Sequence, residues 1–196
     1  MYGEKKYKII NVENKNNKNH LKRMLNWIFI ITICFVISYF INTVFFLNAI
    51  VVSGSMENTI NTDDRIFASK FAYTFDEPKR LDIIVFKFPD DESTLFVKRV
   101  IGLPGDKVEI DSGKVYINDE LLVEDYIKGV PTKTFGVYNV PEGHYFVLGD
   151  HRVYSYDSRF WDNTYVPREN IVAKPFYVYS KKEDQLTETY DADIYR

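Results

Sequence analysis

The spacing of apolar residues divides the chain into two parts. No charged side chain occurs from Met24 to Met56, and Trp27 to Leu47 consists mostly of Ile, Phe and Val. As a helix, such a run crosses the ~30 Å hydrocarbon layer of a bilayer. A buried core helix or a cleavable leader are the alternatives, but the apolar part of a leader is only ~7 to 15 residues long. The pattern therefore favours a retained transmembrane helix over residues 25–47.

Beyond this helix the apolar residues alternate with period two, which is typical of strands, and turn signals such as Leu103-Pro104-Gly105-Asp106 separate the alternating runs. The predicted strands are Asp82 to Phe88, Leu95 to Ile101, Lys107 to Ile110, Lys114 to Ile117, His144 to Leu148 and Pro175 to Tyr179. The sequence thus predicts a mostly β fold: a β domain over residues 48–180 with a small β lobe inserted at about 107–140. Residues 181–196 are expected to form a polar C-terminal tail.

Basic residues lie on only one side of the apolar run. Lys and Arg crowd residues 1–24, whereas the next basic residue after the run is Arg65. By the positive-inside rule, the basic tail stays in the cytoplasm and the chain from about Asn48 onward faces outward. The Asn- and Lys-rich stretch of the tail is typical of a solvated, disordered segment. This predicts a single-pass protein of the plasma membrane with an extracytoplasmic β domain.

Composition excludes several kinds of function. The net charge is only −3, and no basic patch is interleaved with aromatic residues, so nucleic-acid binding has no support. The single cysteine, Cys34, lies within the apolar run. The exported part therefore has neither a disulfide nor a cysteine nucleophile.

A candidate nucleophile follows the apolar run, in the segment Ser53-Gly54-Ser55-Met56. Gly54 allows the backbone to approach a bound carbonyl closely, so Ser55 can attack while its own N–H and the Ser53 hydroxyl stabilise the oxyanion. A serine beside a glycine is also common in ordinary loops. Ser55 becomes a stronger candidate because the chain also has a lysine, Lys98, in an otherwise apolar strand. Ser–Lys pairs are a known variant of nucleophilic catalysis.

Lys98 acts as a base only if burial lowers its pKa from ~10.4 towards ~7 to 8, which costs about 4 kcal/mol. Such a cost favours a partner that orients the neutral amine, and Ser155 is a candidate. The ordinary interpretation is a solvated Lys98 beside an Arg99 that pairs with a carboxylate. Further along, Asp157 and Arg159 project to the same side of an extended segment and are placed to form an ion pair.

Over nearly its whole length after the basic tail, the chain resembles the bacterial type I signal peptidases, in a small Gram-positive-like form. The matching segments keep the family's order: Ser53 to Met56, Asp64-Arg65, Lys70 to Tyr73, Arg80 to Phe88, Val97 to Asp106, and Val140 to Arg159 with Trp161. The resemblance implies a membrane-bound serine endopeptidase that removes signal peptides, with an all-β catalytic fold shared with self-cleaving repressors. It implies no cofactor and no metal. The expected partners are signal-peptide-bearing preproteins and the lipid bilayer.

The resemblance also assigns roles. Ser55 is the expected nucleophile, Lys98 the general base and later acid, and Ser53 a donor to the oxyanion. Ser155 would orient the Lys98 amine. Charged residues expected to support the site are Asp150, Arg152, Asp157 and Arg159. Apolar residues expected to line pockets for small substrate side chains, at positions one and three before the cut, are Val51, Met56, Ile60 and Val97.

Some positions depart from the family's pattern. Asn58 stands where proline is common, Asp63 where glycine is common, and His151, Val153 and Tyr154 replace Asn, Asp and Asn. These changes motivate an alternative: an impaired, membrane-anchored homologue that binds exported chains without cleaving them. A second alternative is a self-cleaving protease of the repressor type. His144 and His151 are interpreted as structural.

Overall fold

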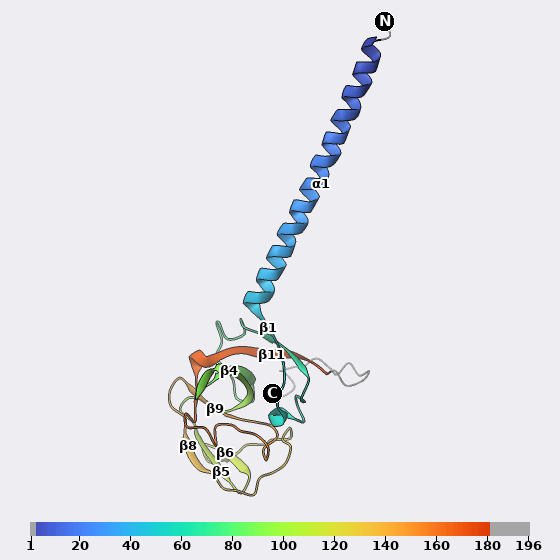
Figure 1. Cartoon of the computed structure of the whole chain (residues 1–196). Coiled ribbons are helices and arrows are strands. Elements are labelled where there is room, and N and C mark those ends of the chain that lie inside the picture. The colour runs from blue at the N-terminus through green and yellow to red at the C-terminus, as the bar shows by residue number, and fades with distance from the viewer. Residues whose placement is uncertain (1–2, 181–196) are drawn as a thin grey trace. The chain divides into compact units, whose positions relative to one another are not determined.

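The computed structural model describes residues 3–180, so the predicted tail at 181–196 lies outside the described residues. The described chain forms two units, a helix and a β domain that begins at Phe45 (Figure 1). Helix α1 runs from Gly3 to Phe45 and includes the basic tail. The expectation of a disordered tail is therefore wrong. The tail continues the apolar helix, and extending a helix that is already nucleated adds one hydrogen bond for each residue fixed.

The apolar part of α1 has the length and exposure expected of a membrane span. It covers His20–Phe45, 26 residues with a mean hydropathy of 2.3. At 1.5 Å per residue, such a helix is about 39 Å long. Its large side chains are uncovered by protein; Phe35 and Tyr39, for example, are 76% and 75% exposed. An apolar surface of this size is compatible with contact with lipid.

An antiparallel sheet of seven strands, in the order β1-β2-β11-β3-β4-β9-β10, forms the body of the β domain. Its strands are β1 (Phe46–Ile50), β2 (Arg65–Ser69), β11 (Ile171–Tyr179), β3 (Ile83–Phe88), β4 (Asp91–Gly102), β9 (His144–Leu148) and β10 (Val166–Pro167). The mostly β fold predicted from the alternating pattern is confirmed. Strands β1, β2 and β10 were not predicted. β1 begins inside the range assigned to the transmembrane helix, and β10 has only two residues.

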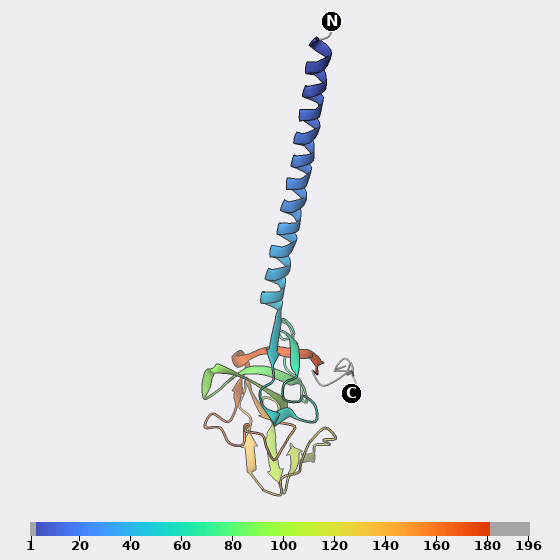
Figure 2. The same ribbon diagram turned by 45° about the vertical axis from the view of Figure 1, so that its right-hand side comes forward.

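A smaller sheet of four strands lies within the stretch predicted as an inserted lobe. Its order is β7-β6-β5-β8, with β5 at Lys107–Asp111, β6 at Lys114–Ile117, β7 at Glu120–Leu121 and β8 at Gly136–Asn139. The β5–β6 hairpin closes at Ser112 and Gly113, both with positive φ. Figures 1 and 2 show this sheet at one end of the domain, on the side of β9 and away from β1 and β11.

One of the hydrophobic cores anchors the segment that carries the candidate nucleophile. It joins residues of that segment to side chains from β2, β3 and β11: Val51, Met56, Ile60, Ile66, Ala68, Ile83, Val85 and Ala173. Met56 and Ile60 are each only 1% exposed. Because packed cores resist small displacements, the residues on both sides of Ser55 are held firmly.

Candidate active site

Ser55 lies on a short 3-10 helix, η1 (Gly54–Met56), immediately after an extended Ser53. The approach to this turn is fixed by main-chain hydrogen bonds, from Val51 N to Asp64 O at 2.9 Å and from Asp63 N to Val51 O at 2.8 Å. Ser55 itself is buried, with 6% of its surface exposed. The local sequence thus presents the hydroxyl at the inner end of a cleft and not on an open loop.

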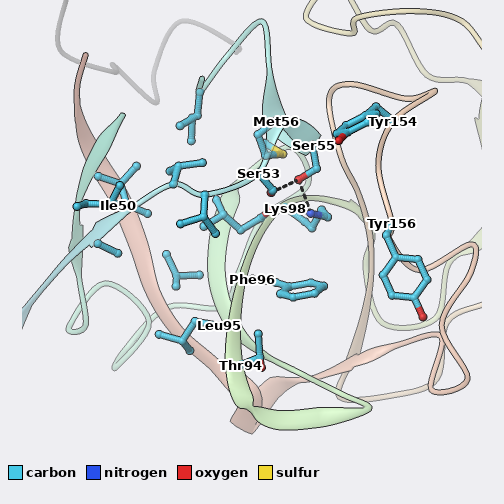
Figure 3. A pocket seen from close by; sticks show the side chains of 17 residues that line it. Ile50, Ser53, Ser55, Met56, Thr94, Leu95, Phe96, Lys98, Tyr154 and Tyr156 are labelled. Atoms are coloured by element: carbon cyan, nitrogen blue, oxygen red, sulfur yellow. Dashed lines mark hydrogen bonds between the residues drawn. The ribbon is translucent and has the colours of Figure 1, made fainter. Parts of the chain in front are cut away.

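The structure brings the predicted serine and lysine together. Lys98 Nζ lies 2.6 Å from Ser55 Oγ, and it also donates to the Val97 carbonyl at 3.2 Å. Ser53 Oγ lies 3.3 Å from Ser55 Oγ, so both hydroxyls and the amine form one cluster (Figure 3). A neutral amine at hydrogen-bond distance can take the proton of the serine hydroxyl. The arrangement can therefore generate an alkoxide-like nucleophile.

Burial controls the chemistry of Lys98. The side chain is 3% exposed, and burial lowers the pKa of its amine to about 8, although the carboxylates of Asp157 and Asp150 act in the opposite direction. At pH 7 this pKa leaves about one amine in ten neutral. The alternative of a solvated Lys98 is wrong. Arg99 is buried as well, so side chains on both faces of the inner part of β4 are covered.

Arg99 and Asp150 form a buried ion pair beside the dyad. Arg99 donates to both carboxylate oxygens of Asp150, at 2.9 and 2.6 Å, and both side chains are almost fully buried. Thr59 adds a hydrogen bond to Asp150 at 2.5 Å, and the Arg99 guanidinium lies 3.9 Å from the centre of the Tyr126 ring. The pair ties the Lys98 strand to the loop 149–159. Two parallel hydrogen bonds fix the orientation of the guanidinium and the carboxylate as well as the distance between them.

The loop 149–159 is held by its own charged residues. Asp157 and Arg159 form the predicted ion pair, at 2.7 Å, and Asp157 also accepts a hydrogen bond from Gly149 N at 3.0 Å. Arg152 pairs with Glu124 and donates to the Gly149 carbonyl at 3.2 Å. All four predicted supporting residues therefore make contacts that stabilise this loop, even where the sequence departs from the family's pattern.

Ser155 does not make the predicted contact with Lys98. Its hydroxyl is buried and has no hydrogen-bond partner among the described residues. It packs against Gly149, where an added Cβ would come 2.1 Å from Ser155 Oγ and 2.5 Å from the Ser55 carbonyl. The main chain of Gly149 is thus close to both serines, and only a glycine permits this approach.

An apolar cleft of about 460 Å³ opens at the dyad (Figure 3). All four predicted pocket residues lie in its wall, together with residues of β1, β2, β3 and β4 and two tyrosines of the loop 149–159. The full lining is Ala49, Ile50, Val51, Val52, Ser53, Ser55, Met56, Ile60, Ile66, Val85, Thr94, Leu95, Phe96, Val97, Lys98, Tyr154 and Tyr156. Most of this wall is apolar, which suits apolar side chains of a ligand.

One edge of β4 beside this cleft is open. From Leu95 to Arg99, β4 pairs with β3, whereas its pairing with β9 begins only at Arg99. Within the described residues, no strand therefore covers the second edge of β4 from Leu95 to Val97. An uncovered edge presents main-chain donors and acceptors to an extended peptide.

The segment from Glu124 to Lys128 also reaches the site, which the sequence did not indicate. Asn58 donates to the Tyr126 carbonyl at 2.9 Å, and Lys128 N donates to the Asp150 carbonyl at 2.7 Å. Lys128 also pairs with Glu57 at 2.9 Å. The segment thus connects the nucleophile turn to the loop 149–159. The sequence of this segment contains no recognisable motif, so its connecting role could be found only from the structure.

A β domain that sets a serine hydroxyl against a buried lysine amine in an apolar cleft defines a class of candidate hydrolases in which lysine replaces histidine. No cluster of His, Cys, Asp or Glu suited to a metal ion occurs in the described part of the chain. The chain belongs to the signal peptidase family, peptidase S26, whose family model matches residues 24–180.

Named relatives carry related descriptions. A probable signal peptidase I-2 from a Synechocystis strain is 41% identical over 63% of this chain and 58% of its own length. A signal peptidase I from Rickettsia bellii is 33% identical over 86% of this chain and 76% of its own. A solved signal peptidase I from Enterococcus faecalis is 33% identical over 52% of this chain and 98% of its own, with a TM-score of 0.44. The match to the Synechocystis relative thus spans less than two thirds of that protein.

Proposed function

We propose that this chain is a membrane-bound serine endopeptidase that removes signal peptides from exported preproteins. It cuts after small residues at positions one and three before the scissile bond. The observation that carries this proposal is the 2.6 Å separation of Lys98 Nζ and Ser55 Oγ at the inner end of an apolar cleft. Membership of the signal peptidase family supports the substrate class.

The first half of the reaction forms an acyl-enzyme. Ser55 Oγ attacks the scissile carbonyl carbon while neutral Lys98 takes the hydroxyl proton. The oxyanion that develops accepts hydrogen bonds from the Ser55 N–H and the Ser53 hydroxyl. Protonated Lys98 then gives its proton to the leaving amine, the C–N bond breaks, and the mature chain departs with a free N-terminus.

The second half releases the signal peptide. Lys98, neutral again, takes a proton from a water molecule that attacks the ester carbon. The resulting tetrahedral species collapses, the bond to Ser55 Oγ breaks, and the proton returns from Lys98 to the serine. One amine thus acts as base and acid in both halves, so no second titrating group is required.

The substrate binds as an added strand. The uncovered edge of β4 at Leu95 to Val97 and the extended segment up to Ser53 supply main-chain hydrogen bonds on the two sides of the cleft. Affinity then comes from the backbone, and selection comes from the shallow apolar wall formed by Val51, Met56, Ile60 and Val97. This wall favours Ala-sized side chains over charged or bulky ones.

Anchoring in the plasma membrane fits this substrate. The basic residues before the apolar helix favour a cytoplasmic N-terminus and an extracytoplasmic catalytic domain. A signal peptide lies in the same bilayer, so confinement to the membrane raises the effective concentration of the enzyme near its cleavage site. The proposed partners are therefore preproteins and lipid.

The proposal is tested by cleavage of a preprotein in lipid vesicles. Ser55→Ala and Lys98→Ala are each expected to abolish cleavage, whereas Lys87→Ala, at an exposed position on the neighbouring β3, is expected to retain it. A penem that acylates serine hydrolases should add its mass to Ser55 in the wild type. Normal cleavage by the Lys98→Ala variant would reject the lysine base, and a chain that neither cleaves nor reacts would reject the enzyme.

A non-cleaving homologue is the alternative from a different class. It was motivated by the unusual residues of the loop 149–159, yet the ion pairs that hold this loop are formed, and Ser55 and Lys98 are in contact. A self-cleaving repressor-type protease is not favoured either, since the family model and the named relatives are those of signal peptidases.

A further inference from the structure

His151 contacts both peptide groups that flank the nucleophile. Its main-chain N–H donates to the Ser55 carbonyl at 3.0 Å, and its ring Nδ1 lies 3.3 Å from the Gly54 carbonyl. A carbonyl only accepts hydrogen bonds, so Nδ1 must carry the proton in this contact. The side chain is 17% exposed and lies at the edge of the site. One residue thus holds the peptide carbonyls before and after the Ser55 Cα.

The carbonyl of Gly54 and the N–H of Ser55 belong to one planar, trans peptide group, in which the two bonds point in opposite directions. Fixing the carbonyl therefore fixes the N–H. The Gly54 carbonyl accepts from the Glu57 N–H at 3.2 Å within the turn and from the His151 ring at 3.3 Å. Rotation of this peptide group would break both bonds, so the Ser55 N–H is directed away from the His151 ring.

Charged groups hold the imidazole in this orientation. Glu57 Oε2 lies 3.5 Å from His151 Nδ1 and 2.9 Å from Lys128 Nζ. The carboxylate also favours a proton on Nδ1, because it is itself an acceptor. Glu57 lies directly over Gly54, where an added Cβ would come 2.6 Å from its Oε1. The ring of Tyr154 packs beside the imidazole, with 5.5 Å between ring centres.

We propose that His151 is a positioning residue for the oxyanion site: its Nδ1–H holds the Gly54–Ser55 peptide group so that the Ser55 N–H stays aligned with the developing oxyanion. This rests on the proposed function. The main effect of His151 is then on the transition state, where charge accumulates on the oxygen, and not on binding of the neutral ground-state carbonyl.

Two substitutions of similar shape separate this role from simple packing. In His151→Asn, the amide Nδ2 takes nearly the place of Nδ1 and remains a donor. In His151→Leu, a methyl group takes that place and cannot donate. His144→Leu is the matched control, because His144 Nδ1 also lies near a main-chain carbonyl, that of Glu142 at 2.8 Å, but at the start of β9 and outside the cleft.

Full-length wild type and variants in vesicles are compared for kcat and KM on a preprotein and for the rate of acylation by a penem. His151→Leu is expected to lower kcat and the acylation rate about three- to tenfold, the effect of one hydrogen bond, with KM within about twofold of wild type. His151→Asn and His144→Leu should remain within about twofold of wild type in all three measurements.

Equal kcat values for the Asn and Leu variants, or a loss confined to KM, would overturn the positioning role while the proposed function stands. A wild type that neither cleaves nor is acylated would overturn both. Thermal unfolding of each variant is measured alongside, and a drop in kcat for His151→Leu that is shared by His151→Asn counts against the proposal.

Discussion

The side-chain amide of Asn58 donates a hydrogen bond of 2.9 Å to the main-chain carbonyl of Tyr126, 68 residues further along the chain. Asn58 adopts a positive φ of 91°, a region that asparagine tolerates better than most residues and proline cannot enter. The residue that departs from the family's common proline therefore has a structural role of its own. It connects the nucleophile turn to the segment from Glu124 to Lys128.

Substitutions at Asn58 should separate its positive φ from its side-chain hydrogen bond to the Tyr126 carbonyl. Asn58→Gly keeps access to positive φ but loses the amide, and is expected to cost about 1 kcal/mol of unfolding free energy. Asn58→Pro loses both and should cost about 3 kcal/mol or more. Urea unfolding of the full chain in detergent micelles measures both values. A proline variant as stable as the wild type would show that the turn readily adopts a different backbone conformation.

Activity should rise with pH. Burial lowers the pKa of Lys98 to about 8, and only the neutral amine acts as base. Where chemistry limits the rate, kcat/KM is expected to increase about tenfold per pH unit well below this pKa and to level off above it. Initial rates on a peptide substrate between mildly acid and alkaline pH provide the test. A flat profile would contradict a lysine base.

The same pKa makes a prediction about stability. In the unfolded chain Lys98 has its ordinary, higher pKa, so between about pH 8 and 10.5 the unfolded state binds more protons than the folded state. Stability therefore gains from rising pH across this window, and the cost of burying the charged amine is present below it. Lys98→Met should remove this cost and raise the unfolding free energy at pH 7 by up to about 3 kcal/mol. A destabilised Met variant would count against the lowered pKa.

Removal of the Ser53 hydroxyl should slow the reaction without weakening substrate binding. Ser53 Oγ lies 3.3 Å from the nucleophile, and the proposed oxyanion loses one of its donors in Ser53→Ala. We expect kcat to fall about 10²- to 10³-fold with KM little changed, as for loss of an oxyanion donor elsewhere. Ser112→Ala, in the remote β5–β6 turn, serves as the control. An unchanged kcat would remove Ser53 from the oxyanion site.

The buried Arg99–Asp150 pair should be far more important for stability than an exposed pair. Asp150→Ala leaves the Arg99 guanidinium buried without its carboxylate, and is expected to cost about 3–5 kcal/mol. Lys107→Ala breaks the largely exposed pair with Asp119 and should cost less than about 1 kcal/mol. The comparison of the two unfolding free energies is the measurement. Similar small values would mean that water or another carboxylate replaces Asp150.

The sequence predicted strands well where alternating apolar residues lie between clear turn signals. β3, β4, β5, β6 and β9 all lie where the pattern placed them. Lys98 was also identified, but from its place in an apolar strand and from the family resemblance. The pattern alone suggested that either Lys98 or Arg99 faces inward, whereas both are buried. Alternation describes a strand with one solvated face, and this part of β4 has none.

Other features of the site depend on contacts between distant segments. Tyr126 and Lys128 belong to a stretch without recognisable chemistry, and their hydrogen bonds to Asn58 and Asp150 arise only when the inserted lobe returns to the main sheet. The predicted bond between Ser155 and Lys98 was wrong for a similar reason. The Ser155 hydroxyl lies against Gly149, and the spacing of residues along the chain does not determine which way this side chain points.

The burial of Lys98 has a consequence for the newly made chain. Desolvation by burial is the main cause of the lowered pKa of its amine, so the shift exists only in the folded β domain. A copy whose β domain is still unfolded keeps an ordinary ammonium group at Lys98 and has no working base. Under the proposed mechanism, the base therefore exists only once the β domain has folded around Lys98, and an unfolded copy cannot cleave the chains beside it.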